Sequence, residues 1–426
     1  MDLKGFATSR LFWIKFAWGI LIGLLAALGV LFYTYVMNLG LKFLWFDRPG
    51  VELFSGSWRV VIIMTGIGFM VGLLHRFTKA KGVGVGEIIK DGGVDNHFVP
   101  GALLISLLSL IGGFSLGPVL PTGMLAGGLA TWISDKRKLS EEIRRSNVVS
   151  SITAAYGGLF TAPLGAFLIP LEMPHVQTIE TYGTLIIAAA TAVLGFSVFF
   201  ISGGYQFDGL LRLLDLPQYT LLPWHLIIAL LIGFLGAAVA WILGQTTSIL
   251  KKLVMPLNRW PILRSTLAGF MLGLLGMTLP LTLFAGSDGL VYVVENAVQI
   301  GAALLVVSIF AKILATAGAL STGFIGGTIF PMFFVGGTLG TVITLLFPDI
   351  PIALAVGCGM VAVTSGILPI PISFGIYTML IVGLPITEAI PIFVSGMTVL
   401  FVMGGFALYA KAPPPEKSSG DTDTFH

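Results

Sequence analysis

The chain contains few charged residues and only one cysteine. Charged residues make up 10% of its 426 residues, whereas about 25% is usual in a soluble domain. Hydrophobic residues account for 56%, and the mean hydropathy is +0.98. This composition predicts an all-α polytopic membrane protein. The single thiol, Cys358, excludes a disulfide within the chain.

The side-chain clusters of most enzymes and metal sites are missing as well. The sequence has no Ser/His pair, no His-x-x-x-His and no phosphate loop. The series Gly82–Gly86 superficially resembles a dinucleotide fingerprint, but no predicted strand precedes it. No basic face interleaved with aromatic residues suggests nucleic acid as a partner. We therefore expect neither an enzyme nor a bound metal or organic cofactor.

Ionisable residues inside apolar segments are candidates for function, because they are costly in a membrane. There are few, and the candidates are Glu172, Glu295, Lys312 and Glu388. None has a histidine or a second carboxylate at helical spacing. For Glu172 and Glu388, which lie near segment ends, we favour a structural or interfacial role over a proton relay.

Spanning the hydrocarbon core takes roughly 20 apolar residues. The chain has apolar segments near 11–45, 57–75, 98–134, 149–171, 182–203, 222–250, 262–285, 289–320, 323–347, 351–384 and 386–410. Several are too long for one helix and are cut by glycine or proline, which predicts shorter, tilted or half-spanning helices. We expect one transmembrane domain over 1–411 and a disordered cytoplasmic tail over 412–426.

The charges between these segments separate by sign. Basic linkers carry Arg76, Lys79, Lys81, Lys136, Arg137, Lys138, Arg144, Arg145, Lys251, Lys252, Arg259 and Arg264. Acidic residues dominate other linkers, namely Asp47, Glu52, Asp208, Asp215 and Asp349. Because basic loops stay in the cytoplasm, this pattern predicts that both termini are cytoplasmic.

Two apolar stretches begin with a glycine-proline signal. In the first, Gly112–Gly117 leads to Pro118, and in the second, Gly326-Gly327-Thr328-Ile329-Phe330 leads to Pro331. In both, glycines follow the proline by five and nine residues, and the two prolines are 213 residues apart. Matched interruptions of this kind indicate an internal repeat with a transport site between its halves. The alternative is that the glycines only allow close helix packing.

A helix that begins inside a membrane presents free N–H groups and a partial positive charge. We therefore predict an anion site made of backbone N–H groups from Ser115–Gly117 and Thr328–Phe330. The hydroxyls of Ser115 and Thr328 either add donors to this site or merely cap their helices, and both readings stay open.

Four motifs in order resemble those of the CLC chloride channel and transporter family, over about 82–405. They are Gly82-Val83-Gly84-Val85-Gly86-Glu87, Phe114-Ser115-Leu116-Gly117-Pro118, Ala162-Pro163-Leu164 followed by Glu172, and Gly326-Gly327-Thr328-Ile329-Phe330-Pro331. The resemblance implies a homodimer in the lipid bilayer, with one pore in each subunit. It implies two inverted halves, about 11–203 and 222–410, and many tilted and half-spanning helices. The anion-binding positions that it implies are Val83, Gly84, Ser115, Leu116, Gly117, Pro118, Gly327, Thr328, Ile329, Phe330 and Pro331.

The sequence departs from the family at each side chain of the site. Leu116 stands at the position of the gating glutamate, and Val83 stands at that of the serine that touches the anion. Met173 occupies the position of the internal proton relay, next to Glu172. The site tyrosine has no clear match, and alignment on Pro391 places it near Ile386 or Thr387. The Ser-Leu-Gly-Pro pattern also resembles a bacterial subgroup of ion-transport proteins.

These features predict a passive channel or uncoupled transporter for chloride or another small anion in a bacterial-type inner membrane. The alternative is a non-conducting membrane protein that keeps the fold for a structural or partner-binding role.

Overall fold

The computed structural model describes residues 9–45, 57–78, 80–173, 182–203 and 213–411. Within these ranges the chain forms helices and no strand, which confirms the predicted all-α class. The predicted tail over 412–426 and the acidic residues Asp47, Glu52 and Asp208 lie outside the described residues.

Seven described helices are long and apolar enough to cross a bilayer. They are α2 (Arg10–Trp45), α3 (Trp58–Phe77), α9 (Tyr182–Ser202), α10 (Pro223–Val254), α11 (Pro261–Thr278), α14 (Ala302–Ser321) and α15 (Ile329–Leu346). The 3-10 turns Met255–Arg259 and Pro280–Thr282 follow α10 and α11.

The remaining helices divide some of the long apolar segments, as the sequence predicted, whereas the segments 11–45 and 222–250 each form one unbroken helix. They are α4 (Val85–Asp91), α5 (Val99–Ile111), α6 (Val119–Lys136), α7 (Glu141–Leu159), α8 (Pro163–Glu172), α12 (Ser287–Glu295), α13 (Ala297–Ile300), α16 (Ile352–Ser365), α17 (Pro371–Val382) and α18 (Ile390–Lys411). Helices α5, α8, α16 and α17 have 10 to 14 residues, fewer than the roughly 20 needed to span a bilayer. The segment 98–134 thus holds α5 and α6, and the segment 351–384 holds α16 and α17.

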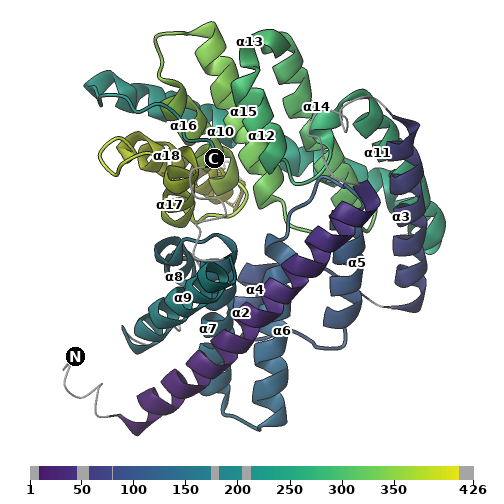
Figure 1. Cartoon of the computed structure of the whole chain (residues 1–426), viewed down its shortest axis with the longest axis vertical. Coiled ribbons are helices and arrows are strands. Elements are labelled where there is room, and N and C mark those ends of the chain that lie inside the picture. Colours follow the sequence, from purple (N-terminus) through teal and green to yellow (C-terminus); the bar gives the residue numbers. More distant parts are fainter. Residues whose placement is uncertain (1–8, 46–56, 79, 174–181, 204–212, 412–426) are drawn as a thin grey trace, which may run out of the picture.

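Helices pack closely through glycine, as expected in lipid, where association depends on contact rather than on the hydrophobic effect. Helices α3 and α11 lie side by side at one edge of the molecule (Figure 1). A Cβ on Gly72 would lie 2.5 Å from the Cα of Ile262, and one on Gly273 would lie 2.9 Å from the Cα of Val61. These contacts make the pair antiparallel, so α3 ends on the face of the molecule where α11 begins.

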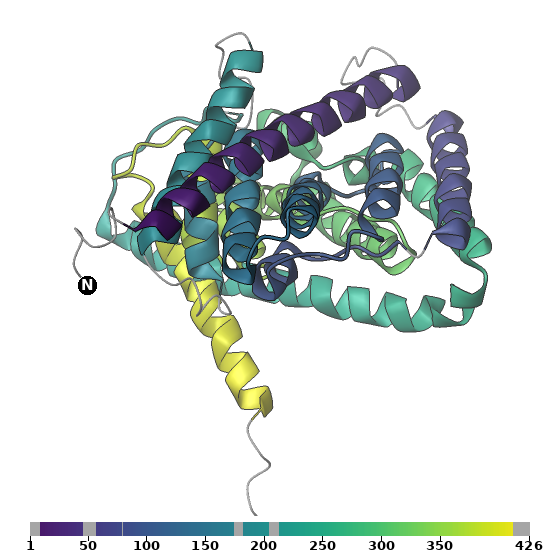
Figure 2. The same ribbon diagram turned by 90° about the horizontal axis from the view of Figure 1, so that it is seen from below.

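Charged contacts bring several basic segments to one face. Lys15 at the start of α2 forms an ion pair with Glu142 at the start of α7. The guanidinium of Arg145 donates to the carbonyl of Lys90 at the end of α4, with 3.1 Å between the atoms. The C-terminal end of α18 projects beyond the body on the side where α3 ends (Figure 2). That this side is cytoplasmic stays a prediction from the charges.

Candidate anion site

The two glycine-rich segments meet in the middle of the fold. The Gly117 N–H donates to the carbonyl of Gly327, and the Gly327 N–H donates to the carbonyl of Gly117, each with 2.7 Å between the atoms. A Cβ on Gly117 would lie 3.1 Å from the Cβ of Phe330, and one on Gly327 would lie 3.1 Å from the Leu120 nitrogen. Only glycine allows the two backbones to approach this closely without displacing a neighbour.

This reciprocal pair corrects the predicted alignment of the repeats. Helices α6 and α15 both have 18 residues, and each begins two residues after its paired glycine. In this register Pro331 corresponds to Pro121, 210 residues earlier, and not to Pro118. The glycine spacing after Pro118 and Pro331 is real, but it does not reflect structural equivalence.

The pairing also changes which backbone N–H groups are free. The Gly117 N–H bonds to Gly327, and the Leu116 N–H donates to the carbonyl of Phe114 over 2.7 Å, so neither is left for an anion. Neither α6 nor α15 has a side-chain hydrogen bond at its N-cap. The first turns of these helices therefore leave N–H groups unpaired, beginning with Val119 and Ile329. Both positive helix ends lie beside the glycine pair.

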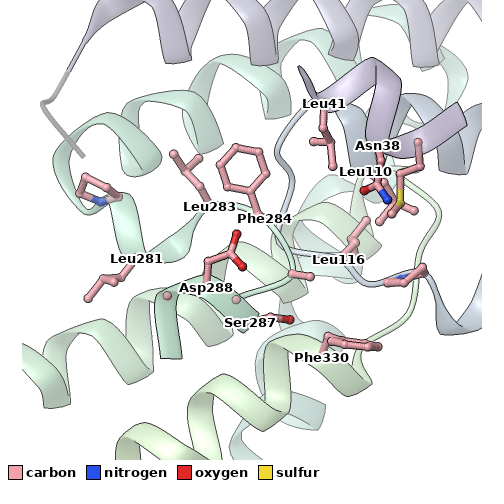
Figure 3. A pocket seen from close by; sticks show the side chains of 16 residues that line it. Asn38, Leu41, Leu110, Leu116, Leu281, Leu283, Phe284, Ser287, Asp288 and Phe330 are labelled. Atoms are coloured by element: carbon pink, nitrogen blue, oxygen red, sulfur yellow. The ribbon is translucent and has the colours of Figure 1, made fainter. Parts of the chain in front are cut away.

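A first cavity, which we call the loop-side cavity, has a volume of about 290 Å³. The loop between α11 and α12 and the end of α2 form much of its wall (Figure 3). Leu116, Pro118 and Phe330 line it from the central segments, and Asp288 contributes a carboxylate.

A second cavity, which we call the aromatic cavity, has a volume of about 180 Å³. It is lined by Gly84, Val85, Gly86, Val119, Leu120, Tyr156, Phe160, Ile169, Met173, Gly327, Thr328, Ile329, Ile367, Leu368, Ile370, Phe374 and Tyr377. No charged side chain is among these described residues. The walls are therefore apolar except for hydroxyls and exposed backbone.

The two cavities are separated by a thin wall. Pro118 lines the loop-side cavity and Val119 lines the aromatic cavity, and Phe330 and Ile329 divide in the same way. Leu116 is only 1% exposed and packs on Gly326, where a Cβ would lie 2.6 Å from the Leu116 Cβ. We call Leu116, Phe330 and the glycine pair the septum. It lies between the two cavities, which share no described lining residue.

Four predicted site residues line neither cavity: Val83, Ser115, Gly117 and Pro331. The Ser115 hydroxyl is 2.8 Å from the hydroxyl of Thr316 on α14 and lines neither cavity. It therefore fixes the segment before α6, residues 112–118, which we call the central segment, to α14. It neither caps α6 nor faces a cavity. Val83 also lies outside the cavity walls, with its N–H 3.5 Å from the sulfur of Met124, whereas the adjacent Gly84 lines the aromatic cavity.

Thr328 has one of the two placements that the sequence left open. It lines the aromatic cavity, and its side chain makes no capping bond to α15. Its hydroxyl has no hydrogen-bond partner among the described residues, so it is available to a ligand.

The sequence missed both tyrosines of the aromatic cavity, Tyr156 and Tyr377. Ile386, at one of the two positions predicted to replace the site tyrosine, is 71% exposed and lines neither cavity. Thr387 is also exposed. Tyr377 on α17 lines the aromatic cavity instead, is 2% exposed, and has a hydroxyl without a partner in the described chain. Its only signal in the sequence was a phenol within an apolar segment.

The neighbouring residues Met173 and Glu172 have different surroundings. Met173 is 6% exposed and lines the aromatic cavity. The Glu172 carboxylate accepts hydrogen bonds from the N–H groups of Ile372 and Ser373, over 2.6 Å and 2.7 Å, and from the Ser373 hydroxyl. Glu172 therefore caps the start of α17, where a carboxylate is favourable. It does not line either cavity.

A buried lysine supports the loop-side cavity. Lys312 on α14 is 0% exposed, and its ammonium donates to the carbonyls of Leu281, Leu283 and Phe284 over 3.2, 2.8 and 2.9 Å. It also lies 5.1 Å from the ring centroid of Phe334, within the range of a cation–π contact. The Phe284 N–H in turn donates to the carbonyl of Gly113 over 2.9 Å. Helix α14 thus holds the central segment through both Lys312 and Thr316.

Comparison with known proteins agrees with this arrangement. A family model described as "Voltage gated chloride channel" matches residues 66–403. The chain is 27% identical over 355 residues to "Putative ion-transport protein YfeO" of Escherichia coli (strain SMS-3-5 / SECEC), covering 80% of this chain and 82% of the relative. It is 26% identical over 355 residues to the protein of the same name in Shigella boydii serotype 4 (strain Sb227), with the same coverage.

Solved structures show the same fold. A CLC-type fluoride/proton antiporter has a TM-score of 0.76 at 19% identity, covering 94% of this chain and 98% of the other. A slow cyanobacterial Cl-/H+ antiporter has a TM-score of 0.75 at 19% identity, covering 92% and 94%. At this identity the likeness concerns the fold alone.

Proposed function

Since this chain belongs to the voltage gated chloride channel family, we propose that it conducts small anions passively, as a channel or an uncoupled transporter. One observation carries the proposal: the N-termini of α6 and α15 meet at the septum with no capping side chain, between two cavities. Unpaired N–H groups and two helix dipoles favour an anion at this point. Val119, Thr328 and Ile329 on the aromatic side, with the hydroxyl of Tyr377, are the binding groups that we propose.

The proposed transport is not coupled to protons. Coupling needs a group that changes charge beside the anion path, and the positions of the family's two glutamates hold Leu116 and Met173. The described residues that line the aromatic cavity include no carboxylate, and the carboxylate of the loop-side cavity, Asp288, stands at neither of these two positions. The nearby Glu172 is engaged at the start of α17 by three hydrogen bonds.

The helix order supports two inverted halves within one transmembrane domain. The lengths of the helices follow a similar order in α2 to α9 and in α10 to α18. Each half begins with a long helix, of 36 and 32 residues, and α6 and α15 have the same length. The antiparallel α3–α11 contact and the Gly117–Gly327 pair are what a twofold axis in the membrane plane would produce.

Anion flux in reconstituted vesicles tests this function. Chloride-loaded vesicles that contain the protein should release chloride faster than empty vesicles once valinomycin is added, because potassium then crosses with the chloride and no opposing voltage builds up. The Leu116→Ala variant belongs in the same experiment, because the septum is closed in this structure. The absence of flux above empty vesicles, for both proteins and for any small anion, would end the proposal.

The burial of the septum also supports a second candidate function, that of a non-conducting membrane protein with a structural or partner-binding role. Leu116 at 1% exposure and Phe330 at 8% exposure close the route between the cavities. Under this alternative, opening the septum by mutation would give no flux while the folded protein persists.

The proposed assembly is a homodimer in a bacterial-type inner membrane, with both termini in the cytoplasm. The assembly and the site of insertion are proposed from the resemblance to the family, and the orientation is proposed from the basic linkers. Crosslinking or mass photometry should show two copies per particle, and a monomer in both detergent and lipid would contradict the assembly.

A further inference from the structure

We propose that the aromatic cavity selects weakly hydrated monovalent anions, such as thiocyanate, nitrate and iodide, over chloride and most strongly over fluoride. This inference rests on the proposed anion transport and names the class of anion that the site prefers. It depends on how few groups in this cavity could replace the water around an anion.

The polar groups of the cavity are few and neutral. Its described lining residues include no charged side chain. Among its hydroxyls, that of Tyr156 already donates to the carbonyl of Val119 over 2.9 Å. The free donors are the hydroxyls of Tyr377 and Thr328, together with the unpaired N–H groups of the α6 and α15 first turns. An anion would exchange many water contacts for a few hydrogen bonds.

The rest of the wall cannot hold water well. Phe160, Phe374, Ile169, Ile370 and Met173 give apolar contacts only. A water in a cavity needs about 2–4 polar partners, so water that accompanied an anion would find few of them. The cavity volume of about 180 Å³ leaves space for a polyatomic anion. The anion is therefore largely stripped of water, and it contacts carbon on most sides.

Stripping water from an anion costs free energy that the site must return. Fluoride, which is small, holds its water most strongly and would lose most. Thiocyanate and iodide spread their charge over a large volume, lose less, and gain dispersion contacts with the aromatic walls. The predicted order of affinity is thiocyanate and iodide first, then nitrate, then chloride, with fluoride last.

Tyr377 is the polar side chain best fixed for this task. Its ring stacks on Phe160, with centroids 4.2 Å apart and an interplanar angle of 15°. A Cβ on Gly165 would lie 2.4 Å from a ring carbon of Tyr377, so the backbone of α8 presses against the ring. The hydroxyl is buried without a partner, and the cost of removing it from water has been met in folding. A bound anion that reached this hydroxyl would satisfy it.

Calorimetric titration of the purified full-length protein with the sodium salts, at constant ionic strength, tests the order without requiring transport. Thiocyanate should bind at least tenfold more tightly than chloride, and fluoride should give no measurable heat of binding. Tyr377→Phe should weaken thiocyanate by about tenfold or more, because it removes a hydrogen bond to a charged group. Thr328→Val provides a second variant if Tyr377→Phe fails to fold. Tyr35→Phe is the matched control, since Tyr35 is 59% exposed on α2.

The flux of the same anions from vesicles separates this proposal from the proposed function. Chloride or fluoride ranking first in binding would overturn the selectivity, and flux of those anions would leave the transport function standing. If Tyr35→Phe and Tyr377→Phe lost the same amount of thiocyanate affinity, the binding heat would reflect a general salt effect, and the proposed site would be wrong. No binding and no flux for any anion would overturn both proposals together.

Discussion

Leu116→Ala is the substitution that most directly probes the septum. Leu116 is 1% exposed, packs on Gly326, and lines the loop-side cavity at the wall shared with the aromatic cavity. An anion can cross only if this side chain leaves its buried position. Burial of a leucine stabilises the closed arrangement by about 1.5–3 kcal/mol.

That free energy sets the expected change in transport. A difference of about 1.4 kcal/mol is tenfold in a rate or equilibrium, so the leucine favours closure by roughly 10-fold to 150-fold. Alanine removes most of this preference and the bulk of a hydrophobic constriction that would exclude water. Chloride efflux from vesicles should therefore increase by about tenfold or more, measured with a chloride electrode at equal protein content.

The same substitution also removes packing, so stability needs a matched control. Leu116→Ala should lower the free energy of unfolding by about 2–5 kcal/mol. Leu305→Ala removes an equally buried leucine of α14 that lines neither cavity, and it should lower stability without increasing efflux. An efflux no faster in Leu116→Ala than in Leu305→Ala, with both folded, would refute the assignment of the septum.

A charged residue at the same position gives a second test. Leu116→Glu should make efflux depend on pH, because an ionised carboxylate competes with the anion for the helix N-termini and a protonated one does not. Efflux should fall as the pH rises through the titration of that carboxyl. A pH-independent efflux would show that position 116 does not face the path.

Three other predictions concern positions away from the septum. Glu172→Gln should lower the free energy of unfolding by about 1–3 kcal/mol, because it weakens the cap of α17. Anion movement should not respond to a proton gradient in this variant or in the unmodified protein. Proton-driven uphill uptake by the unmodified protein that is lost in this variant would show that Glu172 is a relay. Lys312→Met removes the donor to three carbonyls, one of them in a buried bond, and a buried carbonyl left unpaired costs about 1–3 kcal/mol, so its melting temperature in detergent should fall, and an unchanged value would contradict the role given to this lysine. Cysteines introduced at 135–147 in a Cys358→Ala background should resist an impermeant thiol reagent in intact cells, whereas rapid external labelling would reverse the topology.

The sequence alone determined the class of protein and predicted the two segments that the structure brings together. A segment that lies in the bilayer must be apolar and long enough to cross it, so composition and the length of apolar runs identify such segments. The bilayer also imposes a helix on nearly any apolar run. Glycine and proline mark the interruptions, because backbone geometry is a local property. The lack of a carboxylate at Leu116 and Met173 is likewise visible in the chain itself, as is the split of the segments that hold α5, α6, α16 and α17.

Only the tertiary structure decided which groups face the cavities. The Gly117–Gly327 pair joins residues 210 positions apart, and it both corrected the proline alignment and removed the Gly117 N–H from the predicted site, from which the bond to Phe114 also removes the Leu116 N–H. Ser115 turned to Thr316, 201 positions away, and Tyr377 reached the cavity from α17. Helical periodicity specifies the angle of a side chain about its own helix but not the neighbour on that side. That neighbour is set by the packing of the two halves against each other, to which residues throughout the chain contribute.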